Sequence, residues 1–161
     1  TSNSSSRPVT AKDLRAHLRR WHDPQEWVYA EEVMRSQRFS PRDNTNRTLD
    51  AMAVNCWKSR GYVIHGYEIK VTRKDFLREL QDPGKHETFY TWVDKFILVT
   101  PHKLIRPDEL PARWGLMELD ANGRWLRMTK RPTNLGRSEV DTVERDRIVC
   151  FARAMRRVEE K

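Results

Sequence analysis

A strand that leads directly into a helix constrains the fold more than any other feature of this sequence. The stretch GYVIHGYEIKV has the β-branched and aromatic content of a strand, and TRKDFLREL after it has apolar side chains at helical spacing. Thr72 and Asp75 have the spacing of a capping box, which predicts a helix over 73–81. This unit indicates an α/β protein, and the end of such a strand is where open α/β sheets tend to place their chemistry.

Two charged residues, Glu68 and Lys70, interrupt that strand near its end. Successive strand side chains point to opposite faces, so we expect these two to share one face while Tyr67 and Ile69 take the other. Two interpretations stay open at this point. The pair is a structural ion pair on a solvated face, or it belongs to a reactive site.

The length and charge of the chain suit one domain with an anionic partner. The 161 residues are enough for a single core and few for two. Lysine and arginine number 31 against 23 acidic residues, which gives a formal net charge of +8. Nucleic acid, an anionic membrane surface, or solubility alone would each explain such a charge.

Cysteine usage and hydropathy point to a cytoplasmic protein with no membrane partner. Neither Cys56 nor Cys150 belongs to a ligand pattern for zinc or an iron–sulfur cluster, and Cys56 is expected to be a small core residue. No apolar run approaches the ~18 residues of a membrane span. The start TSNSSSRP lacks the apolar core of a signal peptide, and we expect residues 1–9 to be a disordered tail.

Periodicity and turn signals predict ten elements in the order α-α-β-β-α-α-β-β-β-α. A polar, turn-rich loop is expected over 38–46. The helices are expected at about 10–21, 23–34, 73–81, 85–93 and 138–160, and the strands at 47–57, 61–71, 95–100, 114–120 and 125–131. The last two strands flank ANG and are typical of a β-hairpin.

Capping and packing residues support several of these helices. Thr10 with Asp13 suggests the first start, and Asp23 followed by Pro24 and Glu26 suggests the second. The C-terminal helix is expected to pack through its apolar residues, which are Val140, Val143, Ile148, Phe151, Ala152 and Met155. Three tryptophans are assigned to the core and three histidines to structural or surface roles: Trp57, Trp92, Trp114, His65, His86 and His102.

An acidic residue in the apolar run RTLDAMAVNCW calls for an explanation. Asp50 alone interrupts a segment that otherwise looks like a buried strand. A buried acid paired with Arg47 is one interpretation. The other is that Asp50 meets the Glu-x-Lys of the next strand and forms one polar constellation with Glu68 and Lys70.

An Asp on one strand and Glu-x-Lys on the next is the spacing of the PD-(D/E)XK nucleases. The chain resembles this restriction-endonuclease-like superfamily over about residues 24–128, through RTLDAMAV, GYEIKVTRKDF, DKFILVT and WGLMELD. It looks most similar to the MmcB-like group associated with bacterial DNA repair. The positions that match that group are Glu32, Arg47 to Asp50, Glu68 with Lys70, Asp75 with Phe76, and Lys85.

The resemblance implies a fold and a domain organisation. It implies a central mixed β-sheet flanked by helices in α-β-β-α-β-β order, with an extra C-terminal helix. A nuclease-like domain would span residues 10–137, and a helix at 138–161 would pack on it. The family's first motif is loose here, and Leu49 replaces a small residue, so the choice between Glu31 and Glu32 as the upstream acid stays open.

The resemblance also implies a catalytic site and a metal. Phosphodiester hydrolysis adds negative charge to an anionic group, and a divalent cation offsets it. Asp50, Glu68 and the carbonyl of Ile69 would bind Mg²⁺, with Mn²⁺ able to substitute. Lys70 would orient or deprotonate the attacking water, and Glu32 would complete the site.

The expected activity is that of a Mg²⁺-dependent endodeoxyribonuclease in DNA repair, recombination or phage DNA processing. A basic rim would contact DNA phosphates without reading sequence. Its members are Arg47, Arg73, Lys74, Arg78 and Lys85. Two alternatives stay open: a non-catalytic DNA-binding module with the same fold, and a Holliday-junction-resolvase-like enzyme that would act as a homodimer.

Overall fold

The computed structural model describes residues 7–35, 47–82, 89–136 and 139–159. Its elements follow one another along the chain as three helices and six strands. The helices are α1 (Ala11–Trp21), α2 (Arg73–Leu80) and α4 (Glu139–Glu159). The strands are β1 (Trp27–Arg35), β2 (Arg47–Asn55), β3 (Ile64–Ile69), β4 (Lys95–Thr100), β5 (Gly115–Leu119) and β6 (Leu126–Lys130).

All six strands belong to one mixed sheet, with β1 to β6 in sequence order across it. The pairs β1–β2 and β2–β3 are antiparallel, the pairs β3–β4 and β4–β5 are parallel, and β5–β6 is antiparallel. Parallel neighbours require a crossover connection, and α2 lies in the one from β3 to β4. The protein therefore has the predicted α/β architecture with a mixed sheet.

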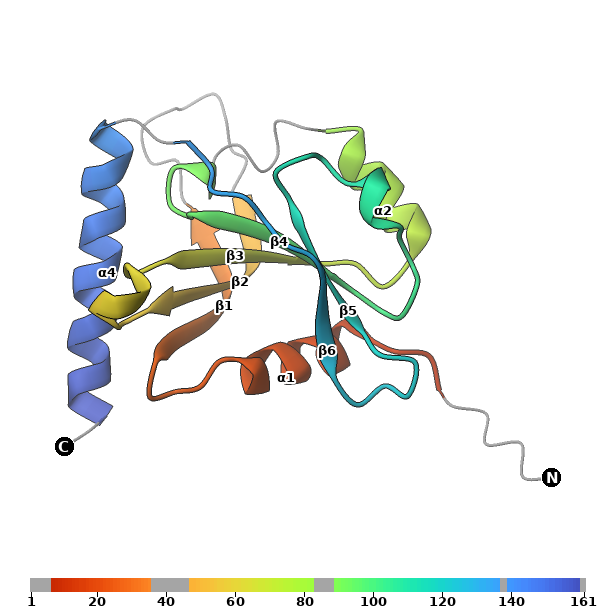
Figure 1. Cartoon of the computed structure of the whole chain (residues 1–161), viewed down its shortest axis with the longest axis horizontal. Helices are drawn as coiled ribbons and strands as arrows, with labels where there is room; N and C mark the ends of the chain where they lie inside the picture. Colours follow the sequence, from red (N-terminus) through yellow and green to blue (C-terminus); the bar gives the residue numbers. More distant parts are fainter. Residues whose placement is uncertain (1–6, 36–46, 83–88, 137–138, 160–161) are drawn as a thin grey trace.

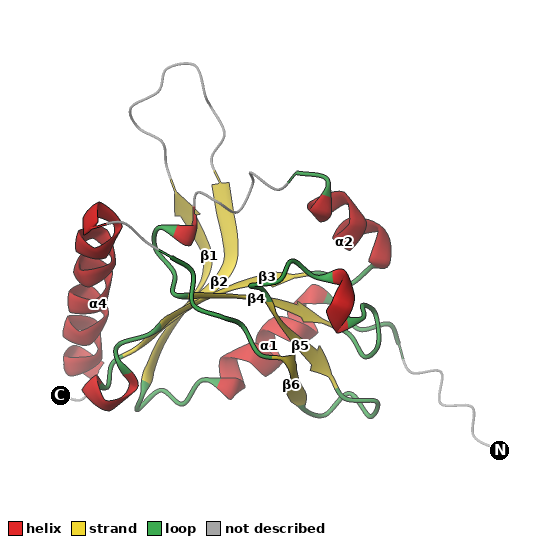
Figure 2. Ribbon diagram, turned by 45° about the horizontal axis from the view of Figure 1, so that its top comes forward, coloured by secondary structure: helices red, strands yellow, loops and turns green. Residues whose placement is uncertain are grey.

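The helices cover both faces of the sheet, which buries two apolar cores (Figures 1 and 2). Leu14 and Leu18 of α1 pack on one face, against a cluster that includes Ala51, Tyr67 and Ile97. On the other face, α2 and α4 enclose the second cluster. Its members include Leu49, Ile64, Phe76, Phe96, Leu98, Val149 and Ala152. Both faces of the central strands β3 and β4 are therefore buried, which explains their nearly unbroken apolar sequences.

The predicted helix over 23–34 is wrong, because residues 27–35 form strand β1. The Asp-Pro signal instead makes a tight turn: the amides of Glu26 and Trp27 both donate to the carbonyl of Asp23, at 3.0 and 2.8 Å. After this turn, β1 pairs with β2 from Trp27 to Arg35. The sheet consequently has six strands where five were expected.

The other capping and hairpin signals are confirmed. Thr10 and Thr72 cap α1 and α2, and each hydroxyl accepts from the backbone amide three residues on, at Asp13 and Asp75. Strands β5 and β6 form the expected hairpin, in which Gly123 has the positive φ of 68° that glycine adopts at little cost. The C-terminal helix is also confirmed as α4.

The expected packing of α4 and of one tryptophan needs correction. Val143, Phe151 and Met155 are exposed, whereas Val149 and Ala152 are buried against the sheet. Of the expected packing residues, Ala152 is therefore confirmed, and Ile148 packs partly buried against the same core. Trp57 is also exposed, at the turn between β2 and β3, while Trp114 is in the core.

Some expectations concern residues outside the described ranges. The loop at 38–46 and most of the tail at 1–9 belong to this group. Residues 85–88 of the helix expected at 85–93 also do, whereas 89–93 are described: Phe89 and Tyr90 are helical, and residues 91–93 are not. Cys56 is buried as expected, with 8% of its surface exposed.

Candidate active site

Glu68 and Lys70 lie at the end of β3 and contact each other on one face of the sheet. The Lys70 ammonium lies 2.8 Å from Oε1 of Glu68. The backbone amide of Lys70 donates to the carbonyl of Val99, so the parallel pairing with β4 continues one residue past the strand. Glu68 is only 4% exposed. This is a buried ion pair and not the solvated one that the first interpretation assumed.

A third buried charge, Glu79 of α2, completes what we call the lysine cluster, consisting of Glu68, Lys70 and Glu79. Oε2 of Glu79 lies 2.9 Å from the Lys70 ammonium. The sequence analysis missed this residue. The available signal was that Glu79 follows Phe76 by three positions, which places it on the same helix face as a core residue.

The lysine cluster fixes the protonation state of Lys70. Burial by itself lowers the pKa of Lys70, but attraction to the Glu68 carboxylate and hydrogen bonds to Glu68 and Glu79 outweigh it, so the pKa lies above its ordinary value. Lys70 is therefore a cation at neutral pH. In this state it can donate hydrogen bonds to an anion but cannot accept a proton from water.

Asp50 of β2 lies beside the backbone of Ile69, on the strand that carries Glu68. Its Oδ2 accepts from the Ile69 amide at 2.8 Å. The β2–β3 ladder ends at the pair Ala51 and Tyr67, so the carboxylate takes the place of the next backbone acceptor. Asp50 is half-buried, and its cationic neighbour is Arg15 at 3.7 Å. The Arg47 side chain, the expected partner, lies outside the described residues.

The β1–β2 pair is irregular next to Asp50. Glu31 pairs with Ala51 and Val33 with Leu49, but Glu32 has a positive φ of 52° between them. Leu49 and Ala51 should share one face of a regular strand, yet they pack in opposite cores. A non-glycine residue with positive φ costs about 1 kcal/mol or more, and such strain is often found at functional sites.

The two candidate upstream acids lie on β1 instead of a helix and have different partners. Glu32 is exposed, and its carboxylate lies 3.3 Å from Arg15. Glu31 lies 2.7 Å from Arg19 and accepts from the Tyr29 hydroxyl at 3.2 Å. Arg15 contacts both Glu32 and Asp50. Glu32 is therefore connected to the candidate site through one side chain, whereas Glu31 contacts Arg19 and Tyr29.

Arg15 of α1 links two acids and was not predicted. It follows Leu14, which is fully buried against the sheet, so the helix places the guanidinium at the edge of the core above Asp50. Its side chain is 28% exposed, which leaves it accessible to a ligand. The sequence signal was its position next to the buried stripe of α1.

Comparisons with known proteins supply the fold alone. No protein-family model matches the chain, and no curated protein sequence matches it. Among solved structures, the chain is similar to the SPO1766 protein of unknown function from Silicibacter pomeroyi. The two share 19% sequence identity with a TM-score of 0.55, over 97% of this chain and 90% of that one. At this identity the likeness supports the α/β fold and says nothing of activity.

The oxygen donors for a metal are fewer than expected. Over residues 7–35, 47–82, 89–136 and 139–159, no three histidine, cysteine or acidic side chains come close enough together to hold a metal ion. Two carboxylates, those of Asp50 and Glu68, come from adjacent strands next to Ile69. One or two carboxylates are what Mg²⁺ usually takes from a protein, with water and phosphate oxygens filling the other positions.

The predicted basic rim is only partly available to a ligand. Arg73 makes a bidentate ion pair with Glu109 and also donates a hydrogen bond to the Leu104 carbonyl. Lys74 and Arg78 are exposed on α2, and the ion pair of Arg78 within the described part of the chain is a long one, 3.9 Å from Asp75. Lys85 and the side chain of Arg47 lie outside the described residues.

A buried histidine–tyrosine chain fastens α1 to β3 behind the site. The Nδ1 of His22 donates to the Leu18 carbonyl, so its Nε2 accepts from the Tyr67 hydroxyl, each at 2.8 Å. His65 contacts the same hydroxyl at 3.1 Å. Burial lowers the pKa of His22 to about 4 and that of His65 to about 3, so both rings are neutral at pH 7.

The described residues include no helix that is both long enough and apolar enough to span a bilayer.

Proposed function

We propose that this protein is a metal-dependent nuclease that hydrolyses phosphodiester bonds in DNA, built on a restriction-endonuclease-like core. The observation that carries the proposal is the buried lysine cluster at the end of β3, beside Asp50 on the Ile69 amide. Burying three charges costs free energy that an apolar core would avoid. Stability alone therefore does not explain why three buried charges lie at the end of a strand.

Asp50, Glu68 and the carbonyl of Ile69 are the groups that would hold Mg²⁺ or Mn²⁺. Bound there, the metal would offset the added charge on phosphate and make hydroxide available near neutral pH. Glu32 is exposed and ion-paired with Arg15, so we propose that it would complete the site through a water molecule or a second metal. Asp50 and Glu68 are hard oxygen donors, which fit these metals.

Lys70 and Arg15 are the cations of the proposed mechanism. Lys70, kept protonated by Glu68 and Glu79, would donate to the phosphate and orient the attacking water. This role favours orientation over deprotonation, the other option that the sequence analysis left open. Glu79 would act as a positioning residue, and Arg15 would hold the Asp50 carboxylate toward β3.

The experiment is single-turnover cleavage of labelled duplex, single-stranded, flap and junction DNA, with and without Mg²⁺. Glu68→Gln is compared with wild type, and Asp108→Asn is the matched control because Asp108 is an exposed acid. Cleavage that needs Mg²⁺ and falls by ~10²-fold or more in Glu68→Gln supports the proposal. No cleavage of any substrate by the wild-type protein in Mg²⁺ or Mn²⁺ contradicts it.

A non-catalytic DNA-binding module is the second candidate, and one observation favours it. Lys70 already has a carboxylate on each side, at 2.8 and 2.9 Å, so both neighbours stabilise it without a substrate. DNA binding in Ca²⁺ with no cleavage in Mg²⁺ is the outcome that this candidate predicts. A junction substrate cut symmetrically by a dimeric protein would instead support the resolvase-like alternative.

A further inference from the structure

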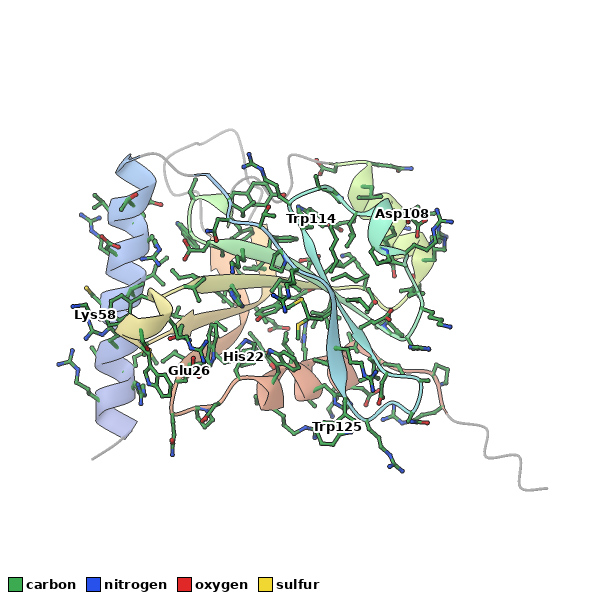
Figure 3. All side chains as sticks on the ribbon, viewed as in Figure 1. His22, Glu26, Lys58, Asp108, Trp114 and Trp125 are labelled. Carbon is green, nitrogen blue, oxygen red and sulfur yellow. The ribbon has the colours of Figure 1, made fainter. Side chains whose placement is uncertain are left out.

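Two exposed tryptophans lie together on the surface between α1 and the β5–β6 hairpin. Trp21 is 49% exposed and Trp125 is 69% exposed. Both line a surface pocket of about 340 Å³, together with His17, Arg20, Arg124 and Leu126. Figure 3 shows Trp125 beside α1. We call Trp21 and Trp125 the tryptophan pair.

The backbone holds each tryptophan in place. Asp120 donates its amide to the Trp125 carbonyl at 2.8 Å, and its carboxylate accepts from the amides of Arg124 and Trp125 at 2.7 and 3.2 Å. Trp21 ends α1, and the next residue, His22, is fastened to Leu18 and to the core. Aromatic rings on a fixed backbone lose little conformational entropy when a ligand binds.

The surroundings of the tryptophan pair are cationic. Among the described residues that line the pocket there are two arginines and no acidic residue. Arg20 contacts the His17 ring at 3.0 Å, and Arg124 is exposed beside the Asp120 carboxylate, which accepts from its backbone amide. Exposed aromatic rings beside two exposed arginines fit a ligand that has both flat apolar faces and negative charges.

We propose that the tryptophan pair is a stacking site for the bases of single-stranded DNA, with Arg20 and Arg124 contacting its phosphates. Every base has a flat face that stacks on an aromatic ring, so such a site works without reading sequence. Bases in a duplex already stack on one another and cannot reach the rings. An acidic protein partner would use the arginines without needing two exposed rings.

The position of the tryptophan pair relates it to the candidate active site. Arg15 contacts Asp50, and Trp21 lies six residues farther along α1, which is about 9 Å. A strand bound at the tryptophan pair would lie on the α1 side of the sheet, whereas α2, which carries Glu79 of the lysine cluster, covers the other face. The inference rests on the proposed function only in taking DNA as the ligand, and stacking itself requires neither the metal nor cleavage.

The test measures binding of a fluorescein-labelled oligothymidylate by fluorescence anisotropy in EDTA, so that no cleavage occurs. Trp125→Ala and Trp21→Ala should each weaken binding by about tenfold or more, and Trp125→Phe should recover most of the affinity. Trp57→Ala is the matched control, because Trp57 is exposed elsewhere on the surface, and it should bind as wild type. Thermal melts check that every variant folds.

Two comparisons isolate base stacking. Inorganic polyphosphate has the charges without the bases, so Trp125→Ala should not change its affinity, whereas Arg124→Ala should reduce it. A duplex of the same length should be insensitive to Trp125→Ala. Equal weakening of oligothymidylate and polyphosphate, equal weakening of the duplex, or no effect of either tryptophan variant would each overturn the proposal.

The two proposals can fail separately. Tryptophan-dependent binding without any cleavage would leave the stacking site standing and refute the nuclease. The opposite result is Mg²⁺-dependent cleavage together with Trp21→Ala and Trp125→Ala variants that bind oligothymidylate as wild type does. That result would support the nuclease and refute the stacking site.

Discussion

The ammonium of Lys70, one residue beyond β3, lies 2.9 Å from the Glu79 carboxylate on α2, and both side chains are almost completely buried. This contact joins the strand end to the helix that follows it. With Glu68 at 2.8 Å on the other side, Lys70 contacts two buried acids at once. The protonation, stability and proposed chemistry of the site therefore depend on one another.

Replacing Lys70 should destabilise the fold in a pH-dependent way. Lys70→Met removes the cation that both buried carboxylates contact, and breaking a buried ion pair typically costs ~3–5 kcal/mol of unfolding free energy. The loss should shrink as the pH falls toward 5, because one carboxylate can then take up a proton. Urea unfolding at pH 7 and pH 5 measures both effects. Lys74→Met is the exposed control, and equal stabilities of the two variants would contradict the burial argument.

The pH profile of cleavage should separate the two roles considered for Lys70. A Lys70 that acts as a cation loses activity when it deprotonates at alkaline pH. Glu79→Gln removes one of the charges that raise the pKa of Lys70, so the alkaline loss should begin at lower pH in this variant. Single-turnover rates across the alkaline range test this. An alkaline loss that begins at the same pH in both proteins would contradict the cationic role of Lys70.

A divalent metal should stabilise the protein through Asp50. Ligand that binds the folded state raises the melting temperature by mass action, so millimolar Mg²⁺ or Mn²⁺ should raise it in wild type. Asp50→Asn should abolish the rise and keep the fold, since the amide oxygen can still accept from Ile69. Asp108→Asn serves as control because Asp108 is an exposed acid. A rise that survives in Asp50→Asn would place the metal elsewhere.

Salt dependence should distinguish the cations of α2. If Lys74 and Arg78 each contact a phosphate of duplex DNA, removing either should reduce the slope of log affinity against log salt by about 0.9. Arg73→Ala should change the slope less and lower the melting temperature more, because Arg73 is ion-paired with Glu109. Titrations at several salt concentrations measure the slopes. Identical slopes for wild type and Lys74→Ala would remove Lys74 from the interface.

Stability should fall between pH 6.5 and about pH 4 because of two buried histidines. Burial lowers the pKa of His22 from 6.5 to about 4 and that of His65 to about 3. The unfolded chain therefore binds more protons in this range, so their contribution is complete above pH 6.5 and is lost as the pH falls toward 4. Unfolding free energies across this range test the sign. His102→Gln, at an exposed histidine, should follow wild type, and a flat wild-type profile would contradict the prediction.

Local signals in the sequence were enough to predict the unit that carries the candidate site. The strand ending at Ile69, the cap at Thr72 and the shared face of Glu68 and Lys70 all depend on residues within a few positions of one another. Strand alternation and capping act at that range, so they are readable without a fold. The β5–β6 hairpin was predicted for the same reason.

Only the tertiary structure decided the identity of β1 and the partners of the charged residues. The Asp23–Pro24 signal fits a helix start and a turn equally well, and pairing with β2 selected the strand. Glu79 and Arg15 reach their partners across 9 and 35 positions of the chain. Such contacts form only when separate elements pack, because the free energy that selects them comes from long-range pairing and burial, which no local pattern encodes.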